Sequence, residues 1–336
     1  MEDNILVVKN LSKEFPIYKG LLRKKSAIVK AVNDVSFEIH RGETLGLVGE
    51  SGSGKTTLGR LILRAIEPTS GEVTYNFADE TNVDFLKLNK KQLKKTRTKI
   101  QMVFQDPYSS LNPRMTVRDI IAETLVANKT MSRSEIDNRV REIADLCKLN
   151  LEHLRRFPHA FSGGQRQRIG IARALAVNPE FVVCDESVSA LDVSVQAEII
   201  NLFKEMQAIK DITYLFIAHD LSIVEHISDR IIVMYLGQIV EEADKKTLFE
   251  NPLHPYTEAL MSAIPEPDPL RKMAPIFLEG EIPNPMNLPT GCYFHPRCHY
   301  ATEKCKKEMP CLRCFGNHKV ACHRAEELHL KQYIKY

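Results

Sequence analysis

Residues 49–56 form a glycine-rich stretch, GESGSGKT, that fits the spacing G-x-x-x-x-G-K-[ST]. An apolar run precedes it and a helical pattern follows. Glycines let backbone N–H groups converge on phosphate oxygens, and the helix adds the positive end of its dipole. In such a loop Lys55 reaches the β- and γ-phosphates and Thr56 binds Mg²⁺. The residues expected at this nucleotide site are Gly49, Glu50, Ser51, Gly52, Ser53, Gly54, Lys55, Thr56 and Thr57.

A second stretch, FVVCDE at residues 181–186, places two carboxylates after four apolar residues. The apolar run predicts a buried strand whose C-terminal end carries Asp185, and ligands bind at that end of α/β sheets. Asp185 is expected to hold Mg²⁺, directly or through water, and Glu186 to orient or deprotonate an attacking water. Such a pair can also cap a helix, so its meaning depends on the glycine-rich stretch elsewhere in the chain.

A third stretch, FSGGQ at residues 161–165, opens another helical pattern and is a second candidate for binding phosphate. One nucleotide does not obviously need two such loops from one chain. Two nucleotides shared between two chains do need them. In that arrangement the second loop of each chain faces the γ-phosphate held by the other chain.

Short apolar runs alternate with helical patterns along most of the chain, which predicts a mostly parallel sheet covered on both faces. The expected strands are residues 5–8, 44–48, 100–104, 181–184, 214–218 and 231–235, and the expected helices are residues 55–65, 165–176 and 193–209. Residues 36–39 and 71–77 have antiparallel character. Residues 108–162 hold helical patterns at 117–127 and 134–149 with no convincing strand, so we expect a helical insertion there.

The composition changes after about residue 250. Seven of the 17 prolines lie between Pro265 and Pro289, which predicts an extended linker because proline breaks helices and removes hydrogen-bond donors from sheets. Six of the eight cysteines follow within residues 292–322. We therefore expect a nucleotide-binding domain over residues 1–251 and a C-terminal extension, with a proline-rich linker and a cysteine-rich tail, over residues 252–336.

The charge and composition describe a soluble globular protein. A net charge of +3 is too small to indicate nucleic acid as the main partner. The N-terminus, MEDNILVVKN, shows no signal-peptide pattern, and no apolar run approaches the ~18 residues that a membrane span needs. We expect a cytosolic chain, and structural disulfides are rare in that compartment.

These motifs resemble those of the nucleotide-binding subunits of ABC transporters. GESGSGKT resembles the Walker A motif, FVVCDE the Walker B motif and FSGGQ the signature loop. The resemblance implies a P-loop (RecA-like) α/β ABC ATPase core with an antiparallel β subdomain, a helical insertion and a small cysteine-rich C-terminal extension. It also implies that the signature loop contacts the ATP of a partner subunit through Ser162, Gly163, Gly164 and Gln165.

Four further residues match markers of that family, in family order. Gln105 in VFQDP matches the Q-loop glutamine, which contacts Mg²⁺ or water and the membrane subunit. Asp192 in SALD matches the D-loop, and His219 in FIAHD matches the switch histidine that contacts the γ-phosphate. Phe15 in NLSKEF falls where the family stacks an aromatic ring on adenine, and Tyr18 is a second candidate. The implied catalytic residues are Glu186, His219 and Gln105, and the implied Mg²⁺ ligands are Thr56, Gln105 and Asp185.

Longer stretches resemble the ATPases of oligopeptide and dipeptide importers, some of which carry nickel complexes instead. They are GLVGESGSGKTTLGRLILRAIEPTSGEV, VFQDPYSSLNPRMTV, PHAFSGGQRQRIGIARALAVNP, SALDVSVQAEI and NPLHPYTEALMSAIP. Within that group KTTLGRLILR is similar to the F-type member of a heterodimeric ATPase pair. Departures are Ala160 where Glu is common, Ser187 where Pro is usual and Cys311 where Pro is common. None of them removes a phosphate or Mg²⁺ ligand.

The resemblance implies an ATP-hydrolysing subunit that powers peptide import at the cytoplasmic face of the membrane. Its implied partners are a second ABC ATPase subunit, two transmembrane permease subunits and an extracytoplasmic substrate-binding protein. The alternative is a soluble ABC ATPase that moves no substrate and is regulated by a redox- or metal-sensing tail. DNA-repair members of the class carry a long coiled-coil insertion and translation factors carry two cassettes, and the sequence shows neither.

The tail cysteines have the spacing C-x5-C-x6-C-x16-C, formed by Cys292, Cys298, Cys305 and Cys322. This spacing resembles the C-terminal cysteine set of the importer subfamily, some members of which bind a [4Fe–4S] cluster there. Four thiolates suit such a cluster chemically, although the spacing is not a ferredoxin pattern. The resemblance therefore implies a cluster on these four residues.

Zinc is the competing cofactor for the tail. Cys311 and Cys314 have the spacing of half a zinc site, and His318, Cys322 and His323 can complete a tetrahedral set. A reduced, metal-free tail is the third alternative. Either metal would help to fold a segment that is too short and proline-rich to build its own core.

Overall fold

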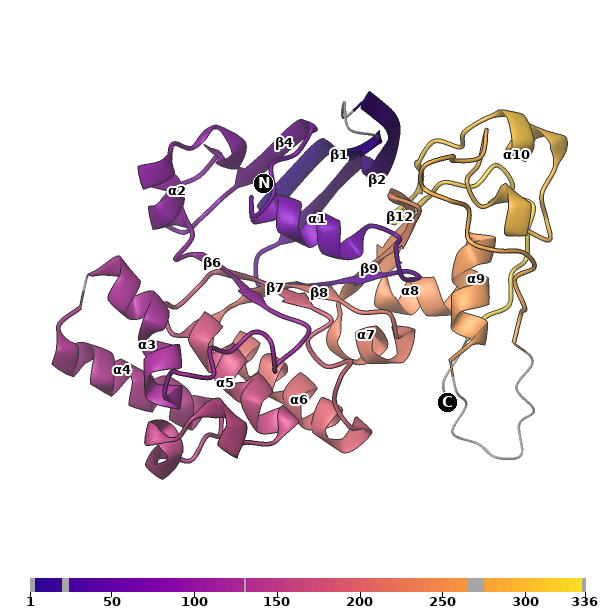
Figure 1. Cartoon of the computed structure of the whole chain (residues 1–336). Helices are drawn as coiled ribbons and strands as arrows, with labels where there is room; N and C mark the ends of the chain where they lie inside the picture. The colour runs from indigo at the N-terminus through magenta and orange to yellow at the C-terminus, as the bar shows by residue number, and fades with distance from the viewer. Residues whose placement is uncertain (1–3, 20–23, 130, 265–274, 334–336) are drawn as a thin grey trace, which may run out of the picture. The chain divides into compact units, whose positions relative to one another are not determined.

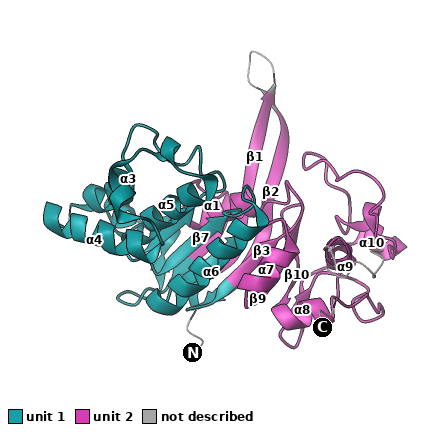
Figure 2. Ribbon diagram, turned by 90° about the horizontal axis from the view of Figure 1, so that it is seen from below, with its two compact units in different colours: residues 1–6, 38–44, 74–217 teal, residues 7–37, 45–73, 218–336 magenta. Residues whose placement is uncertain are grey.

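The computed structural model describes residues 4–19, 24–129, 131–264 and 275–333 (Figure 1). The chain divides into two compact units (Figure 2). Unit 1 contains residues 1–6, 38–44 and 74–217, and unit 2 contains residues 7–37, 45–73 and 218–336. Each unit is thus assembled from segments that lie far apart in the sequence.

Unit 1 is built on three parallel strands in the order β6-β7-β8, which are Ile100–Val103, Phe181–Asp185 and Thr213–Ile217. Strands β7 and β8 are buried at every position, as expected for parallel strands covered on both faces. The strands predicted at 100–104, 181–184 and 214–218 are confirmed to within one residue. Further helices of this unit are η1 (Phe85–Lys87), α2 (Lys90–Thr96), α5 (Gly163–Leu175) and α6 (Val193–Lys210).

The stretch predicted as a helical insertion contains helices and, among its described residues, no strand. Its helices are α3 (Val117–Asn128), α4 (Arg133–Leu146), η2 (Leu151–Arg155) and η3 (Pro158–Ala160). The side chains of Thr116 and Ser132 cap α3 and α4 by accepting backbone N–H groups, which satisfies donors that the first turn leaves unpaired. Helix α4 ends before the predicted residue 149 because Lys148 has a left-handed backbone, with φ of 58°.

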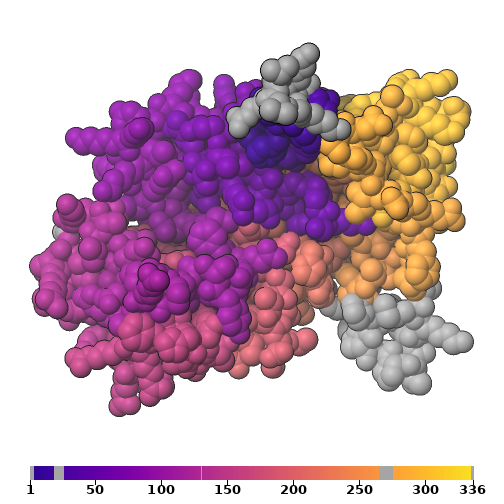
Figure 3. Space-filling model, viewed as in Figure 1, coloured from indigo at the N-terminus to yellow at the C-terminus, as the bar shows by residue number. Residues whose placement is uncertain are grey.

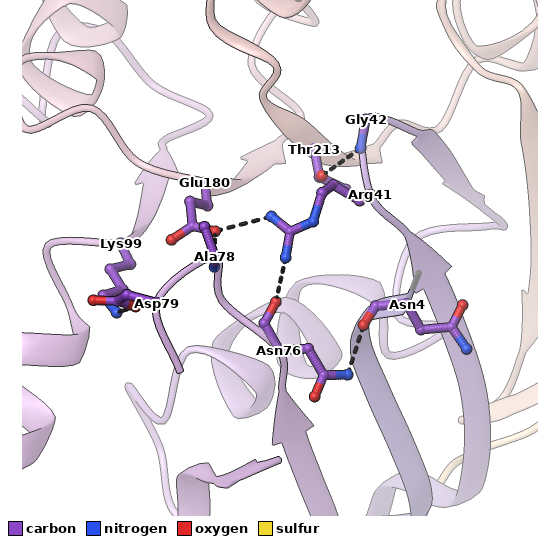
Figure 4. Close-up of polar contacts among 9 residues, drawn as sticks. All are labelled: Asn4, Arg41, Gly42, Asn76, Ala78, Asp79, Lys99, Glu180 and Thr213. Carbon is purple, nitrogen blue, oxygen red and sulfur yellow. Dashed lines mark hydrogen bonds and ion pairs between the residues drawn. The ribbon is translucent and has the colours of Figure 1, made fainter. Parts of the chain in front are cut away.

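A polar cluster joins distant segments of unit 1 (Figure 4). Arg41 donates one guanidinium nitrogen to a Glu180 carboxylate oxygen at 2.9 Å and the other to the Asn76 carbonyl oxygen at 2.7 Å. The Gly42 N–H donates to the Thr213 hydroxyl at 2.9 Å. Because Glu180 directly precedes β7 and Thr213 begins β8, these contacts hold the starts of two strands, and the far end of β7 carries the predicted site residue Asp185.

Unit 2 contains a mixed sheet in which β3 (Thr44–Val48) runs parallel to β9 (Arg230–Tyr235). Strand β9 pairs antiparallel with β10 (Gln238–Asp244), and β12 (His318–Val320) pairs with β10 and with β11 (Arg313–Phe315). The predicted strands at 44–48 and 231–235 are confirmed, whereas β10, β11 and β12 are not among the predictions. The helices here are α1 (Lys55–Ile62), α7 (Leu221–Ile227), α8 (Lys245–Glu250), α9 (Pro255–Ser262), η4 (His295–Arg297) and α10 (Glu303–Lys307).

A second sheet has the strand order β2-β1-β4-β5, formed by Lys24–His40, Asn4–Lys19, Ser70–Tyr75 and Val83–Asp84. Strands β4 and β5 pair antiparallel, in line with the predicted antiparallel character. Strands β1 and β2 are much longer than the predicted residues 5–8 and 36–39. Their additional residues are largely polar and partly exposed, so they lack the apolar run by which a buried strand is recognised.

The C-terminal tail has little regular structure. Of the predicted proline-rich linker, residues 265–274 lie outside the described residues, and residues 275–291 form neither helix nor strand. The side chains of the tail gather in one block, orange to yellow in Figure 3. Strand β12 adds the tail to the sheet of unit 2, with Val320 opposite Glu241 and Lys319 opposite Glu242.

Candidate functional site

The glycine-rich loop of residues 49–56 lies in unit 2, between the fully buried strand β3 and helix α1. Gly49 has φ of 151° and Gly54 has φ of 103°, which residues with a side chain rarely adopt. A Cβ atom on Gly49 would lie 2.2 Å from the Met234 carbonyl oxygen, and one on Gly54 would lie 2.3 Å from the Ala31 carbonyl oxygen. Both glycines are therefore required by backbone packing as well as by the predicted binding of phosphate.

Lys55 is held inside this loop. Its ammonium nitrogen donates to the Gly49 carbonyl oxygen at 2.6 Å and to the Glu50 carbonyl oxygen at 3.0 Å, and the residue is only 4% exposed. The Ser53 hydroxyl is also buried and has no hydrogen-bond partner among the described residues. A buried cation beside a buried hydroxyl that lacks a partner fits a loop that receives an oxygen-rich anion.

The FVVCDE stretch lies in unit 1, and it forms the predicted buried strand with Asp185 buried at the end of β7. Glu186 follows with a left-handed backbone, φ 46°, so its side chain leaves the strand direction. Gln105 donates its amide N–H to a Glu186 carboxylate oxygen at 2.6 Å. The structure thus brings together two of the predicted catalytic residues, which lie 81 positions apart in the sequence.

The FSGGQ stretch starts helix α5 in unit 1. Ser162 caps the helix by accepting the Gln165 N–H at 3.4 Å, and the Gln165 side chain accepts the Ser162 N–H at 3.1 Å. Ser162 and Gln165 are exposed, while Gly163 and Gly164 are half-buried. Asp192, also exposed, precedes α6 without capping it through its side chain.

Two more predicted residues lie in unit 2. Phe15 is 40% exposed on β1, and the Lys13 ammonium lies 5.0 Å from the centre of its ring. His219 is exposed between β8 and α7. That Phe15 stacks on the adenine stays a prediction. Tyr18, the second candidate, is more exposed than Phe15 at 57%.

The tail cysteines fall into two groups. Cys292, Cys298, Cys305 and Cys322 line one small cavity in unit 2, together with His254 and Phe294. Cys311 and Cys314 are exposed and do not line it. The four residues named from their spacing therefore converge, although 30 positions separate the first from the last.

Burial governs the chemistry of these thiols. It raises the pKa of Cys292 to about 11 and that of Cys298 to about 12, and it also raises the pKa of Cys322. Backbone N–H groups of Phe294, Tyr300 and Arg324 donate to the sulfurs of Cys292, Cys298 and Cys322 and act in the opposite direction. Burial of Cys292, Cys298 and Cys322 thus favours their neutral thiol form, while backbone N–H donors already point at these three sulfur atoms.

The histidines of the zinc alternative have other partners. His318 is buried, with its Nε2 atom 2.7 Å from a Glu241 carboxylate oxygen, and His323 Nε2 lies 2.9 Å from the Glu308 carbonyl oxygen. Within residues 4–19, 24–129, 131–264 and 275–333, no group of three or more His, Cys, Asp or Glu side chains is arranged to hold a metal ion.

Two contacts of the glycine-rich loop were not predicted. Arg297, which directly precedes Cys298, forms an ion pair with Glu50, and the Tyr256 hydroxyl accepts the Glu50 N–H at 2.8 Å. Both residues lie in stretches that the sequence analysis associates only with a subfamily. Neither Tyr256 nor Arg297 stands in a sequence pattern that indicates a contact with Glu50, which lies more than 200 positions away.

The chain is similar to known proteins over the region that contains these motifs. The family model described as ABC transporter matches residues 32–189, which include the glycine-rich loop, FSGGQ and FVVCDE. A dimeric, post-hydrolysis structure of the ATP-binding cassette MJ0796 with ADP and Pi is 30% identical, with a TM-score of 0.62 over 71% of this chain and 98% of that one. The fold is that of an ATPase of the ABC class, which binds ATP with Mg²⁺.

A second family model, described as the oligopeptide/dipeptide transporter C-terminal region, matches residues 240–305. The oligopeptide transport ATP-binding protein AppF of Bacillus subtilis is 49% identical over 96% of this chain and 98% of its own length. The di/tripeptide transport ATP-binding protein DppF of Pseudomonas aeruginosa is 45% identical over 97% and 99%. The chain therefore belongs to the ATP-binding subunits of oligopeptide/dipeptide ABC transporters. No helix among the described residues has the length and apolar character needed to cross a membrane.

Proposed function

We propose that this chain hydrolyses ATP to power the import of di- or oligopeptides through separate membrane subunits. The observation that carries this proposal is the match of nearly the whole chain, cassette and C-terminal region together, to peptide-transport ATPases. The partners would be a second ABC ATPase subunit, two permease subunits and an extracytoplasmic substrate-binding protein. The chain would then work at the cytoplasmic face of the membrane.

The site residues would divide the hydrolysis among them. Lys55 and the backbone of residues 49–57 would hold the phosphates, and Phe15 would stack on the adenine. Thr56, Asp185 and Gln105 supply hydroxyl, carboxylate and amide oxygens of the kind that Mg²⁺ prefers, and the ion would neutralise charge on the phosphates. Ser162, Gly163, Gly164 and Gln165 would contact the ATP of the partner subunit, with Asp192 at the same interface.

Glu186 would act as the general base. A water oxygen attacks the γ-phosphorus, the bond from that phosphorus to the bridging oxygen of ADP breaks, and Glu186 accepts the water proton. The hydrogen bond from Gln105 at 2.6 Å would orient the carboxylate that does this. His219 would contact the γ-phosphate, so that its release can be transmitted to the partner subunits. The helical stretch of residues 108–162 would carry that signal to a permease.

Expression with the neighbouring genes tests the transport function. The affinity-tagged chain should co-purify with two membrane proteins and one further ABC ATPase. Cells should take up a radiolabelled tripeptide, and uptake should stop in the Glu186→Gln variant while nickel uptake is unchanged. Co-purification without membrane proteins, together with peptide uptake that survives deletion of the gene, contradicts the proposal.

We further infer that Cys292, Cys298, Cys305 and Cys322 hold a [4Fe–4S] cluster. Their convergence on one cavity and the N–H groups directed at three of the sulfurs support this donor set. A single zinc ion needs all its ligands at about 2.1–2.3 Å from one point. A cluster is larger, and each of its four irons needs only one thiolate.

Purification without oxygen tests the cluster. A brown protein with about four irons and four sulfides per chain is the expected result. A colourless protein with about one zinc, or with no metal, contradicts it. The division of the chain at residue 251 into cassette and extension belongs to the same proposal, because the extension would then be the part that the cluster folds.

A further inference from the structure

Glu50, the second residue of the glycine-rich loop, is held at each of its polar groups. Its N–H donates to the Tyr256 hydroxyl at 2.8 Å, and its carbonyl oxygen accepts from Lys55 at 3.0 Å. Its two carboxylate oxygens accept from the two terminal nitrogens of Arg297, at 2.7 and 3.0 Å. This fork geometry is the strongest that an arginine forms with a carboxylate, because both bonds are charge-assisted. Loop and partners all belong to unit 2.

Arg297 has little freedom to move. Its side chain is 7% exposed, and its Nη1 atom lies 3.4 Å from the Tyr235 hydroxyl. Around it, the ring of Phe294 packs on Tyr235 and Tyr256 with centroids 5.3 and 5.4 Å away. Tyr256 and Arg297 both lie in residues 240–305, the part that matches the transporter C-terminal region, and Arg297 directly precedes Cys298. The extension thus holds the loop at two points.

The charge of Glu50 makes its ion pair with Arg297 relevant to the binding of ATP. A carboxylate in a loop that receives a triphosphate repels the substrate, because both carry negative charge. Arg297 neutralises that carboxylate and keeps its side chain in one orientation. A loop whose backbone is fixed before the substrate arrives also loses less entropy on binding.

We propose that Arg297 is a positioning residue for ATP, acting through Glu50, so that the C-terminal extension forms part of the nucleotide site. This inference rests on the ATPase activity of the class and does not depend on peptide transport or on a metal in the tail. A role that is only structural differs in one respect: it affects folding but leaves the affinity of the folded chain for ATP unchanged.

The test is a set of variants of the full chain, titrated with a fluorescent, slowly hydrolysed ATP analogue in Mg²⁺. Arg297→Gln should weaken binding about tenfold, because it leaves the Glu50 carboxylate unpaired in the loop. Glu50→Gln should weaken binding only about twofold. The double variant should bind like Glu50→Gln, since removing the carboxylate removes the repulsion. In steady state, Arg297→Gln should raise the KM for ATP and change kcat by less than about twofold.

Two further variants keep the test decisive. Arg297→Lys retains the charge without the fork and should recover much of the affinity, which also covers the case in which Arg297→Gln fails to fold. Lys306→Gln removes an exposed ion pair of the same extension, with Glu303, and should leave binding and melting unchanged. The inference is overturned if Arg297→Gln melts earlier yet binds the analogue normally, or if the losses in the double variant simply multiply.

Discussion

The glycine-rich loop and the cysteine cavity both lie in unit 2, but they differ in how far they are prepared for the ligands that we propose for them. The loop is already ordered: the Lys55 ammonium donates hydrogen bonds to two carbonyl oxygens of the loop, and Glu50 is held at its N–H, carbonyl and carboxylate groups. The cavity instead buries thiols whose pKa values are raised, so the thiolates needed for a metal are unfavourable until one arrives. A substrate site must be ready at each turnover, whereas the cofactor site that we propose for the cavity would need to form only once.

The largest expected effect separates the chemical step of hydrolysis from the binding of ATP by the ordered loop. Glu186→Gln should lower the steady-state rate of ATP hydrolysis about 10³-fold, because the amide cannot accept the proton of the attacking water. Binding of ATP should be nearly unchanged, since the loop of residues 49–57 is intact. The matched control is Glu198→Gln, which removes an exposed carboxylate paired with Arg168. Hydrolysis at the wild-type rate in Glu186→Gln would show that another group is the base.

The next effect tests whether ATP binding depends on the backbone conformation of the glycine-rich loop. Gly49→Ala should weaken ATP binding about 10²-fold, because the new Cβ would meet the Met234 carbonyl oxygen at 2.2 Å and φ of 151° is strained. Isothermal titration calorimetry measures the affinity. Gly280→Ala is the control, since that glycine also has a positive φ, 81°, but a Cβ would meet nothing within 4 Å. Equal losses in both variants would argue for general destabilisation.

The iron content of the chain should depend on which cysteine is replaced, and not only on how many cysteines remain. Cys298→Ser should reduce iron per chain to less than about half, because one ligand of four is lost. Cys314→Ser removes a neighbouring but exposed cysteine that does not line the cavity, and should leave the iron content unchanged. Iron and sulfide analysis of anaerobically purified protein measures both. Equal iron in the two variants contradicts the assignment of the ligands.

The smallest expected effect is the pH dependence of the reduced, metal-free chain. The folded-state pKa values of Cys292 and Cys298, about 11 and about 12, lie above the ordinary thiol value of about 8.5. Above that value the unfolded chain binds fewer protons than the folded chain, so stability is complete below about pH 8.5 and falls as pH rises toward 11–12. Melting temperatures should therefore decline between pH 8 and pH 10, and less steeply in Cys292→Ser/Cys298→Ser. Parallel declines would exclude these thiols as the cause.

Most of the strands and helices around the ATP site were predictable because they follow local rules. Strands β3, β7, β8 and β9 are continuous apolar runs, and helices α5 and α6 follow regular patterns, so their residues alone indicate them. Strand β10 was missed for the opposite reason. It buries Glu241 and Glu242, and their carboxylates are held by groups from other segments: His318 and Lys319 of β12, Arg230 of β9, and the backbone N–H groups of Leu253 and His254. No local pattern can show a partner 77 positions away.

The same distinction applies to the site. The glycines, Lys55 and the Asp185-Glu186 pair carry their chemistry in residue type and spacing, because a phosphate-binding loop is made by consecutive backbone groups. The amino-acid sequence by itself therefore determined the class of the enzyme and the order of its motifs. Only the tertiary structure showed that Gln105 meets Glu186, that four of the six tail cysteines share a cavity and that Arg297 holds Glu50 across 247 positions. These contacts join residues that are distant along the chain, and only the packing of the fold decides which of them meet.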